Sequence, residues 1–469
     1  MAIVSLGCPK NLVDSERMLA LLAEDGCLVP APADRADVVL VNTCAFIAPA
    51  VAESMEAIRE ALEQKRRGRV RRVVVAGCLV NRAGRGLLKE LPEIDALVRV
   101  EQRERIAEAV RGASGARGAH SAGEERGASS AVPTFRRPKG RLNIGHLREG
   151  VASDSGRFRL TPRHTAYLRI SEGCSRRCAF CTIPAIRGPF RSKPPDMVLA
   201  EARELAADGA VELNVIGQDT TSYGADLGVR GGLARLLRGL AGVEGVRWVR
   251  LMYAHPRGFG DELIGVLGEG GKVVPYVDLP LQHVSDAVLR RMGRATTRRQ
   301  IESLLERLRR RVAGLVLRTT FLVGFPGETD AQFAELLAFV RDFAFDAVGS
   351  FAFCPEPGTR AAGLDGQLPD AVKRRRREEL MLAQQAVALA SNRRRLGATL
   401  RVLVDGRDRQ GASVGRYYGQ APEIDSICRL TRPRRPGTFV SARVVAADGY
   451  DLVVEPIRSR RGAARAQSK

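Results

Sequence analysis

The stretch TAYLRISEGCSRRCAFCTIPAIRGPFRS, residues 165–192, indicates both the fold and the chemistry of this chain. It joins an apolar run, Ala166–Ile170, which predicts a buried strand, to three thiols within eight residues, Cys174, Cys178 and Cys181. Soft thiolate ligands favour iron–sulfur clusters or zinc. A structural zinc ion needs four ligands, usually in two close pairs, and no fourth cysteine or histidine lies nearby. The loop therefore predicts a 4Fe–4S cluster in which one iron has no protein ligand. The alternatives are a small zinc-binding loop and chance clustering of the thiols.

A series of alternating strands and helices surrounds this loop. Strands are predicted at Ala166–Ile170, Val211–Ile216, Trp248–Met252, Tyr276–Leu279, Val316–Val323 and Ala347–Phe353, with helices such as Pro195–Asp208 and Thr297–Arg311 between them. Six such units suit an incomplete parallel (βα)6 barrel better than a complete eight-unit one. The cysteine loop follows the first strand, at the carboxyl end where barrel active sites lie.

The N-terminal segment predicts a separate α/β domain with a doubly wound parallel sheet. Its strands are predicted at Ile3–Leu6, Val38–Val41 and Val73–Ala76, and its helices at Leu12–Glu24, Ile47–Lys65 and Arg82–Leu91. Each strand is followed by a cysteine: Cys8, Cys44 and Cys78. Because the carboxyl ends of parallel strands converge on a ligand crevice, these thiols are predicted to meet and hold a second cluster with an open iron. The alternative is three buried structural thiols.

The C-terminal part changes character. A long charged helix is predicted at Pro369–Arg395, with the basic run Lys373–Arg377. Short β runs follow at Leu400–Val404, Phe439–Val444 and Tyr450–Val454, and they indicate a small all-β barrel. The expected boundaries are a cluster domain at 1–111, a flexible Gly/Ala/Ser/Arg-rich linker at 112–159, the barrel at 160–390, the β domain at 391–463 and a tail at 464–469.

Composition narrows the class of protein. No apolar run is long enough to span a membrane and the N-terminus carries no signal peptide, so a cytoplasmic protein is expected. The net charge of +22 fits a nucleic-acid or ribosomal partner, but it equally fits charge concentrated in Arg-rich segments. Nine cysteines in a reducing compartment argue against disulfides, and Cys27, Cys354 and Cys428 are expected to be buried or incidental.

The C-x3-C-x2-C spacing is the signature of radical S-adenosylmethionine enzymes, and the two triplets in this order resemble the methylthiotransferases. SLGCPKNLVDSE around Cys8, NTCAF around Cys44, AGC at Cys78, TTFLVGFPGETD and FCPEPGTRAA carry the resemblance. It implies an N-terminal cluster domain, a radical S-adenosylmethionine barrel and a C-terminal TRAM barrel. SLGC-x-KN-x-VDSE, IGQDTTSYG and GQAPEIDS look like the branch that modifies a ribosomal protein.

The resemblance implies two 4Fe–4S clusters and S-adenosyl-L-methionine, together with an electron donor and a sulfur donor. The reaction implied is addition of a methylthio group to the β-carbon of an aspartate in ribosomal protein twelve of the small subunit, either as the free protein or on the assembling ribosome. The cluster on Cys174, Cys178 and Cys181 would drive cofactor cleavage, and the one on Cys8, Cys44 and Cys78 would deliver sulfur. The alternatives are a tRNA adenosine methylthiotransferase and a non-catalytic iron–sulfur regulator that binds RNA.

Five further residues are candidates for the cofactor site. Phe180 is expected either to pack near the adenine or to belong to the core. Gln218 and Asp219 follow a strand and could bond the amino or ribose groups. The turn from Gly324 to Glu328 could let backbone approach the adenine, or could be only a tight strand exit.

The charge of the predicted C-terminal barrel bears on the acceptor. Residues 397–457 carry nine basic and seven acidic side chains, a net charge of +2, and Glu423 and Asp425 lie together. A module that binds tRNA needs more Lys and Arg to meet phosphates. This segment therefore favours a protein acceptor, while Lys373–Arg377 and the Arg-rich tail could contact ribosomal RNA or could simply be solvated.

Overall fold

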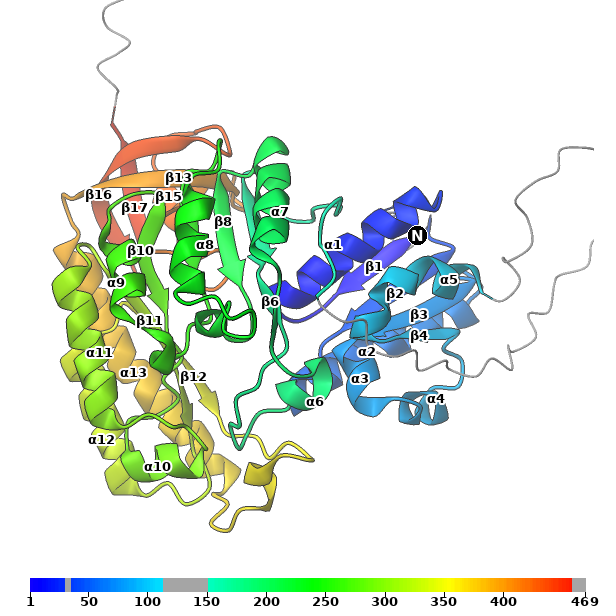
Figure 1. Cartoon of the computed structure of the whole chain (residues 1–469), viewed down its shortest axis with the longest axis horizontal. Coiled ribbons are helices and arrows are strands. Elements are labelled where there is room, and N and C mark those ends of the chain that lie inside the picture. Colours follow the sequence, from blue (N-terminus) through cyan, green and yellow to red (C-terminus); the bar gives the residue numbers. More distant parts are fainter. Residues whose placement is uncertain (30–34, 113–150, 458–469) are drawn as a thin grey trace, which may run out of the picture. The chain divides into compact units, whose positions relative to one another are not determined.

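The computed structural model describes residues 1–29, 35–112 and 151–457, which form two compact units (Figure 1). The first comprises Met1–Leu160 with Ala185–Arg187, and the second comprises Thr161–Pro184 and Gly188 onward. Most of the predicted linker and the whole predicted tail lie outside the described residues. No helix in the described part of the chain is long and apolar enough to cross a membrane.

The first unit is built on a four-stranded parallel sheet, as predicted. Its order is β1 (Ala2–Ser5), β2 (Val38–Thr43), β3 (Arg72–Gly77) and β4 (Ala96–Val98). The strand order in the sheet follows the chain order. β4 was not predicted, because three residues carry too little periodicity to be recognised.

Helices cover both faces of this sheet because side chains alternate along each strand. Val39 and Val41 of β2 pack in one core with α2 (Ala48–Arg66), while Leu40 between them packs in another with α1 (Pro9–Glu24). Near-continuous Val/Leu strands are thus buried on both sides.

Two segments of this unit differ from the expectation. The helix predicted at Arg82–Leu91 is two short helices, α3 (Cys78–Ala83) and α4 (Gly86–Glu90), separated at Gly84, whose φ is +54°. Residues 151–160, assigned mostly to the linker, pack on the first unit. The backbone N–H of Phe158 donates to the Glu16 carbonyl at 3.0 Å, and buried Asp154 pairs with Arg103 at 2.7 Å. A short helix, α5 (Ile106–Arg111), closes the regular structure before the undescribed stretch.

The second unit contains the predicted incomplete barrel, a six-stranded parallel sheet with all six strands where the sequence placed them. The sheet order is β12 (Ala347–Ala352), β11 (Val316–Val323), β10 (Val273–Asp278), β9 (Trp248–Leu251), β8 (Glu212–Ile216) and β5 (Thr165–Arg169). A short hairpin, β6 (Ser171–Glu172) with β7 (Arg191–Ser192), flanks the cysteine loop. The helices of this unit are α7 (Pro195–Ala207), α8 (Gly232–Ala241), α9 (Asp261–Gly268), α10 (Asp286–Arg291), α11 (Arg298–Arg311), α12 (Asp330–Phe343) and α13 (Asp370–Arg394). The short helix α6 (Ile183–Arg187) begins in this unit, and its residues Ala185–Arg187 belong to the first.

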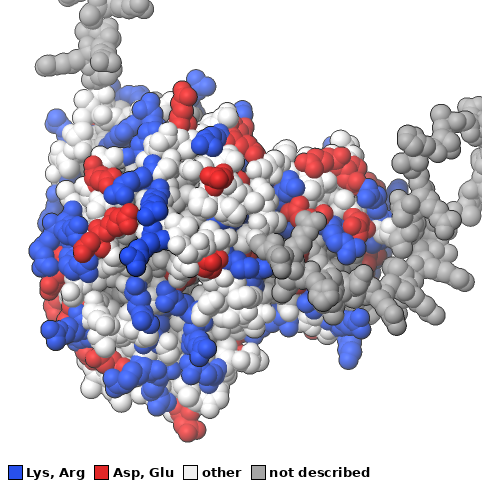
Figure 2. All heavy atoms as spheres, in the orientation of Figure 1, with Lys and Arg blue, Asp and Glu red and all other residues white. Residues whose placement is uncertain are grey.

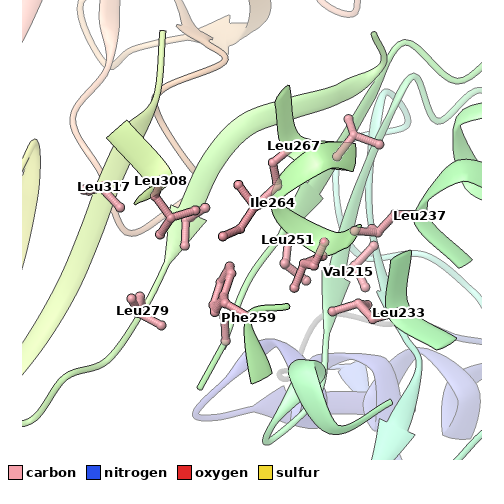
Figure 3. Packing of buried hydrophobic residues seen from close by; sticks show 14 of the residues in the cluster. Val215, Leu233, Leu237, Leu251, Phe259, Ile264, Leu267, Leu279, Leu308 and Leu317 are labelled. Carbon is pink, nitrogen blue, oxygen red and sulfur yellow. The ribbon is translucent and has the colours of Figure 1, made fainter. Parts of the chain in front are cut away.

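Strand and helix side chains interlock in one large core. Val215 and Leu251, from β8 and β9, lie against Leu237 of α8 and Ile264 of α9 (Figure 3). Such fully buried aliphatic side chains each contribute about 1.5–3 kcal/mol of transfer free energy. This core holds the strands rigidly, and their carboxyl ends carry the cysteine loop.

A closed five-stranded barrel follows α13, as predicted. Its order is β13 (Thr399–Arg407), β14 (Ser413–Tyr417), β15 (Cys428–Leu430), β17 (Asp451–Pro456) and β16 (Phe439–Asp448). β14 and β15 were not predicted, since both are short and rich in Gly, Arg or Cys. Cys428 is fully buried in this barrel's core, as expected.

The C-terminal barrel packs against the amino ends of the large barrel's strands. Buried Glu212, the first residue of β8, accepts from Arg416 of β14 at 2.7 Å and from Arg250 of β9 at 3.0 Å. Asp425 accepts from the Tyr276 hydroxyl at 2.7 Å. Within the second unit, the small barrel thus lies opposite the strand ends that carry the cysteine loop.

The structure shows where the charged side chains of two segments lie, the acidic one in the C-terminal barrel and the basic run in α13. Asp425 accepts from the Tyr276 hydroxyl and pairs with Arg318, so this acidic side chain serves the contact between the two barrels. In the run Lys373–Arg377, Lys373 and Arg376 are buried, so only part of it faces solvent. On the face shown in Figure 2, Lys and Arg side chains lie among Asp and Glu rather than forming one basic patch.

Candidate metal centres

The first candidate centre is formed by the cysteines at the carboxyl ends of β1, β2 and β3. Thr43 pairs with Gly77, so Cys44 and Cys78 each lie one position past paired residues. Gly7 lies directly against Cys44: a Cβ on Gly7 would be 2.6 Å from the Cys44 Cβ. The parallel sheet therefore brings together Cys8, Cys44 and Cys78, as the sequence predicted from the strand positions.

Glycines make this convergence possible. Gly7 and Gly77 precede Cys8 and Cys78, with φ of +89° and +94°. A Cβ on Gly77 would be 2.4 Å from the Asn42 side-chain oxygen, so only glycine fits there. The Gly-Cys pairs in SLGC and AGC are therefore a packing requirement of the centre.

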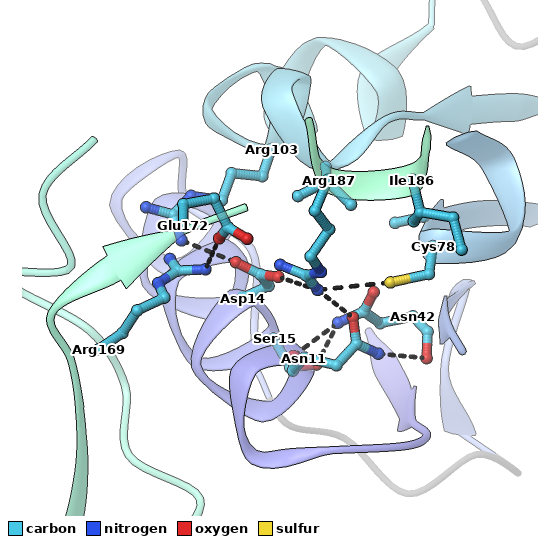
Figure 4. Close-up of polar contacts among 12 residues, drawn as sticks. Asn11, Asp14, Ser15, Asn42, Cys78, Arg103, Arg169, Glu172, Ile186 and Arg187 are labelled. Carbon is cyan, nitrogen blue, oxygen red and sulfur yellow. Dashed lines mark hydrogen bonds and ion pairs between the residues drawn. The ribbon is translucent and has the colours of Figure 1, made fainter. Parts of the chain in front are cut away.

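Polar side chains hold the three strand exits in place. Asn11 donates through Nδ2 to the Leu6 carbonyl at 2.7 Å, and Asn42 donates to the Asn11 carbonyl at 2.9 Å (Figure 4). Ser54 Oγ accepts from the Cys44 N–H at 3.1 Å and donates to the Cys44 carbonyl at 2.8 Å. Our sequence reasoning missed Asn11, Asn42 and Ser54; the motifs PKN and NTC contained the first two without revealing their partners.

The three thiols affect one another electrostatically. Burial raises the pKa of the Cys78 thiol to about 11; Arg187 opposes this rise and Cys8 and Cys44 add to it. Burial likewise raises the pKa of Cys44. Burial also opposes ionisation of Cys8, but Lys10 and Arg187 outweigh it, and the pKa of Cys8 is lowered. Adjacent thiolates need a cation to offset their charge, and bound iron would supply one.

The second candidate centre is the loop with Cys174, Cys178 and Cys181, which follows β5 and β6 in the second unit. Backbone bonds fix it: the Cys174 N–H donates to the Gly188 carbonyl at 3.1 Å, and the Ala179 N–H to the Met292 carbonyl at 2.8 Å. Gly173, with φ of +74°, packs so closely on Pro189 that a Cβ would be 2.1 Å from the Pro189 carbonyl oxygen.

Two arginines stabilise this loop. Arg176 lies between the first two cysteines and pairs with Asp219 at 2.7 Å. Arg294 donates to Cys178 Sγ at 3.8 Å. Burial raises the pKa of Cys181 to about 12, and Cys178 and Cys174 contribute to the rise. These thiols too would require a cationic partner to ionise together.

Both donor sets fit an iron–sulfur cluster. In the described residues, no three His, Cys, Asp or Glu side chains are arranged to hold a single metal ion. A cubane cluster does not need that arrangement, because each thiolate binds its own iron. Each centre offers three thiols, which is the set that leaves one iron open to another ligand.

The predicted cofactor-binding residues have definite surroundings. Gln218 donates to Glu172 at 2.8 Å, and its buried side-chain oxygen has no partner in the described structure, so it remains a candidate acceptor for a cofactor N–H. The Asp219 carboxylate already binds Arg176, Thr221 and Ser222. Asp219 therefore ties Arg176 of the cysteine loop to the segment that follows β8.

The other candidates lie closer to the core. Phe180 is half-buried and packs on a cluster that includes Phe325 and Met292. A Cβ on Gly324, with φ of +71°, would be 2.5 Å from Lys373 Cγ. Glu328 accepts from the Gly324 N–H at 2.8 Å and from Arg376 at 2.8 Å. These contacts favour the tight strand exit for the Gly324–Glu328 turn, and its role toward a cofactor stays a prediction.

Three family models match successive parts of the chain. They are the uncharacterized protein family UPF0004 at residues 1–99, the radical SAM superfamily at 168–340 and the TRAM domain at 396–457. These matches agree with the three folded segments and their order.

Curated relatives match nearly the whole chain. A ribosomal protein uS12 methylthiotransferase RimO from Symbiobacterium thermophilum is 44% identical over 461 residues, covering 97% of this chain and 90% of that protein. Its namesake from Anaeromyxobacter sp. strain K is 44% identical over 453 residues, covering 96% and 91%. Among solved structures, the fold is similar to that of the radical S-adenosylmethionine methyltransferase TsrM from Kitasatospora setae, with a TM-score of 0.49 and 18% sequence identity. The match covers 72% of this chain and 69% of that one, and no conclusion is drawn from it.

Proposed function

We propose that this chain, which belongs to the family of the RimO ribosomal protein uS12 methylthiotransferases, adds a methylthio group to the β-carbon of an aspartate of uS12. The observation that carries the proposal is the pair of three-cysteine centres, each at the carboxyl ends of parallel strands.

Cys174, Cys178 and Cys181 would hold one 4Fe–4S cluster, and Cys8, Cys44 and Cys78 would hold the other. When bound, the first supplies the electron that cleaves S-adenosylmethionine and the second supplies sulfur. The chain's own contribution is to hold the ligands: Asp219 orients Arg176 inside the cluster loop, and the Met292 carbonyl fixes Ala179. Gln218 offers its free side-chain oxygen to a cofactor N–H.

The proposed reaction requires partners besides the acceptor protein. Electrons and sulfur atoms are consumed in each turnover, so an electron donor and a sulfur donor must supply them. The acceptor is either free uS12 or uS12 on the assembling ribosome, and a comparison of free uS12 with assembly particles as substrates distinguishes the two.

The decisive experiment compares cells with and without the gene. The mass of uS12 and the nucleosides of tRNA are measured, and the expected result is loss of one methylthio increment from uS12 alone. Complementation with Cys174→Ala should fail to restore it, whereas Cys27→Ala, outside both centres, should restore it. A change in tRNA with unmodified uS12 would instead identify a tRNA methylthiotransferase.

A second measurement tests the chemistry itself. Purified protein, reconstituted with iron and sulfide and then reduced, should release 5′-deoxyadenosine from S-adenosylmethionine. If it releases none, the chain is no radical enzyme, and the remaining alternative is an iron–sulfur regulator that binds RNA.

A further inference from the structure

Arg187 is a buried side chain that the proposed reaction does not yet use. It ends α6, six residues after Cys181, and it belongs by its contacts to the first unit. Its side chain is 1% exposed. Burying a guanidinium is costly unless it is paired, so the groups that hold it indicate its role.

The guanidinium contacts a carboxylate, an amide oxygen and a ligand cysteine. Nη2 donates to Asp14 Oδ2 at 3.0 Å, to Asn11 Oδ1 at 3.5 Å and to Cys78 Sγ at 3.4 Å (Figure 4). The Asn81 side chain donates to the Ile186 carbonyl at 2.8 Å and holds the preceding residue. The backbone beside Arg187 and the Arg187 guanidinium are therefore both held by hydrogen bonds, and one of these bonds is donated to a sulfur atom.

A second buried arginine shares the same carboxylate without reaching sulfur. Arg103 donates to Asp14 Oδ1 at 2.8 Å and pairs with Asp154 at 2.7 Å. Asp14 is thus held from both sides, and removing either arginine leaves it with the other. The two arginines differ in the contact with Cys78.

We propose that Arg187 is a positioning residue of the N-terminal cluster, which holds Cys78 and raises the reduction potential of the cluster through its charge and its N–H···S bond. A reduced cluster is more negative than an oxidised one, so a fixed cation and a donor on a ligand sulfur stabilise the reduced state. The inference rests on the proposed function, since it requires a cluster on Cys8, Cys44 and Cys78.

The test isolates the N-terminal cluster in the full-length chain. With Cys174, Cys178 and Cys181 replaced by Ala, iron content and the reduction potential are measured by redox titration monitored by electron paramagnetic resonance. We expect Arg187→Met to shift the potential to a more negative value, Arg187→Lys to shift it less, and Arg103→Met to leave it unchanged. Loss of the cluster in Arg187→Met with retention in Arg103→Met would equally support positioning.

Other outcomes overturn the inference. Arg187 would have only a packing role if the reduction potential were unchanged in Arg187→Met. The same conclusion would follow if Arg187→Met and Arg103→Met shifted the potential equally or lost the cluster equally. If the parent triple-Ala chain itself binds no cluster, the proposed second centre fails, which is a separate result from failure of Arg187.

Discussion

Gly7→Ala tests whether the close approach of strand exits builds the N-terminal centre. Gly7 has φ of +89°, and an added Cβ would lie 2.6 Å from the Cβ and 2.9 Å from the Sγ of Cys44, whereas real Cβ contacts essentially never fall under 3.0 Å. The methyl group cannot be accommodated unless Cys44 moves. The substitution therefore displaces a proposed ligand without removing any thiol.

The expected loss of unfolding free energy in Gly7→Ala has two parts, backbone strain and the collision with Cys44, and the control variant Gly26→Ala separates them. A left-handed backbone costs alanine about 1–2 kcal/mol. Gly26, at the end of α1 in the same unit, has φ of +85° with nothing within 4 Å of an added Cβ, so Gly26→Ala carries the backbone cost alone. The collision at Gly7 adds about 1–3 kcal/mol, typical of overpacking.

The assay measures iron and sulfide per chain and the free energy of unfolding in urea, on full-length protein purified without oxygen. Gly26→Ala should lower the unfolding free energy by about 1–2 kcal/mol and keep both clusters. Gly7→Ala should lower it further and lose about half of the iron, because Cys174, Cys178 and Cys181 are untouched.

Full iron in Gly7→Ala would refute the reasoning, since it would show that Cys44 need not lie where the structure places it. Equal iron loss in Gly7→Ala and Gly26→Ala would assign the effect to backbone strain rather than to the contact with Cys44.

Three further predictions concern the second unit. Glu212→Gln should lower the unfolding free energy by about 3–5 kcal/mol, measured in urea, because buried Arg250 loses its carboxylate partner and buried Arg416 retains Asp405 but loses Glu212; a loss below 1 kcal/mol, the scale of a surface pair, would contradict this. Burial opposes ionisation of Glu212, but its arginine partners outweigh burial and lower the pKa of the carboxyl to about 2 from 4.5, so its contribution is present above pH 4.5 and lost as pH falls through 2. Melting temperatures across this range should fall more steeply for the parent than for Glu212→Gln, and parallel curves would contradict the assignment. Asp219→Ala should free Arg176 and reduce iron retention by the Cys174 loop, measured by iron content after gel filtration, whereas Asp261→Ala, which removes only exposed ion pairs, should not; equal retention in both would exclude a role for Asp219 in ordering the loop.

Much of the architecture follows from local pattern. All six strands of the large barrel, three of the four N-terminal strands and α13 lie where apolar runs and helical periodicity predicted them. The short strands β4, β14 and β15 were missed, because three to five residues hold too few side chains to show alternation. α3 and α4 were predicted as one helix because the positive φ of Gly84 is not visible in a periodic pattern.

The cofactor candidates show where local pattern stops. Asp219 was predicted from its position after a strand and Glu328 from the turn that begins at Gly324, and both carboxylates bind arginines of the chain, Arg176 and Arg376. Those partners lie 43 and 48 residues away. A strand-end position predicts which edge of the sheet a side chain occupies, but it says nothing about which distant side chain is already there.

The sequence by itself determined the two proposed ligand sets: one has three thiols within eight residues of a single loop, and the other has three cysteines, each preceded by Gly or Thr, that follow parallel strands of one sheet. These follow from short-range geometry, in which strand direction and spacing suffice. Only the tertiary structure decided what surrounds the sulfurs, namely Arg187 on Cys78 and Arg294 on Cys178, each more than 100 residues from its cysteine. It also decided that Asp425 serves the joint between two barrels, because an ion pair depends on which charges the folded chain buries together and not on the charge a segment carries.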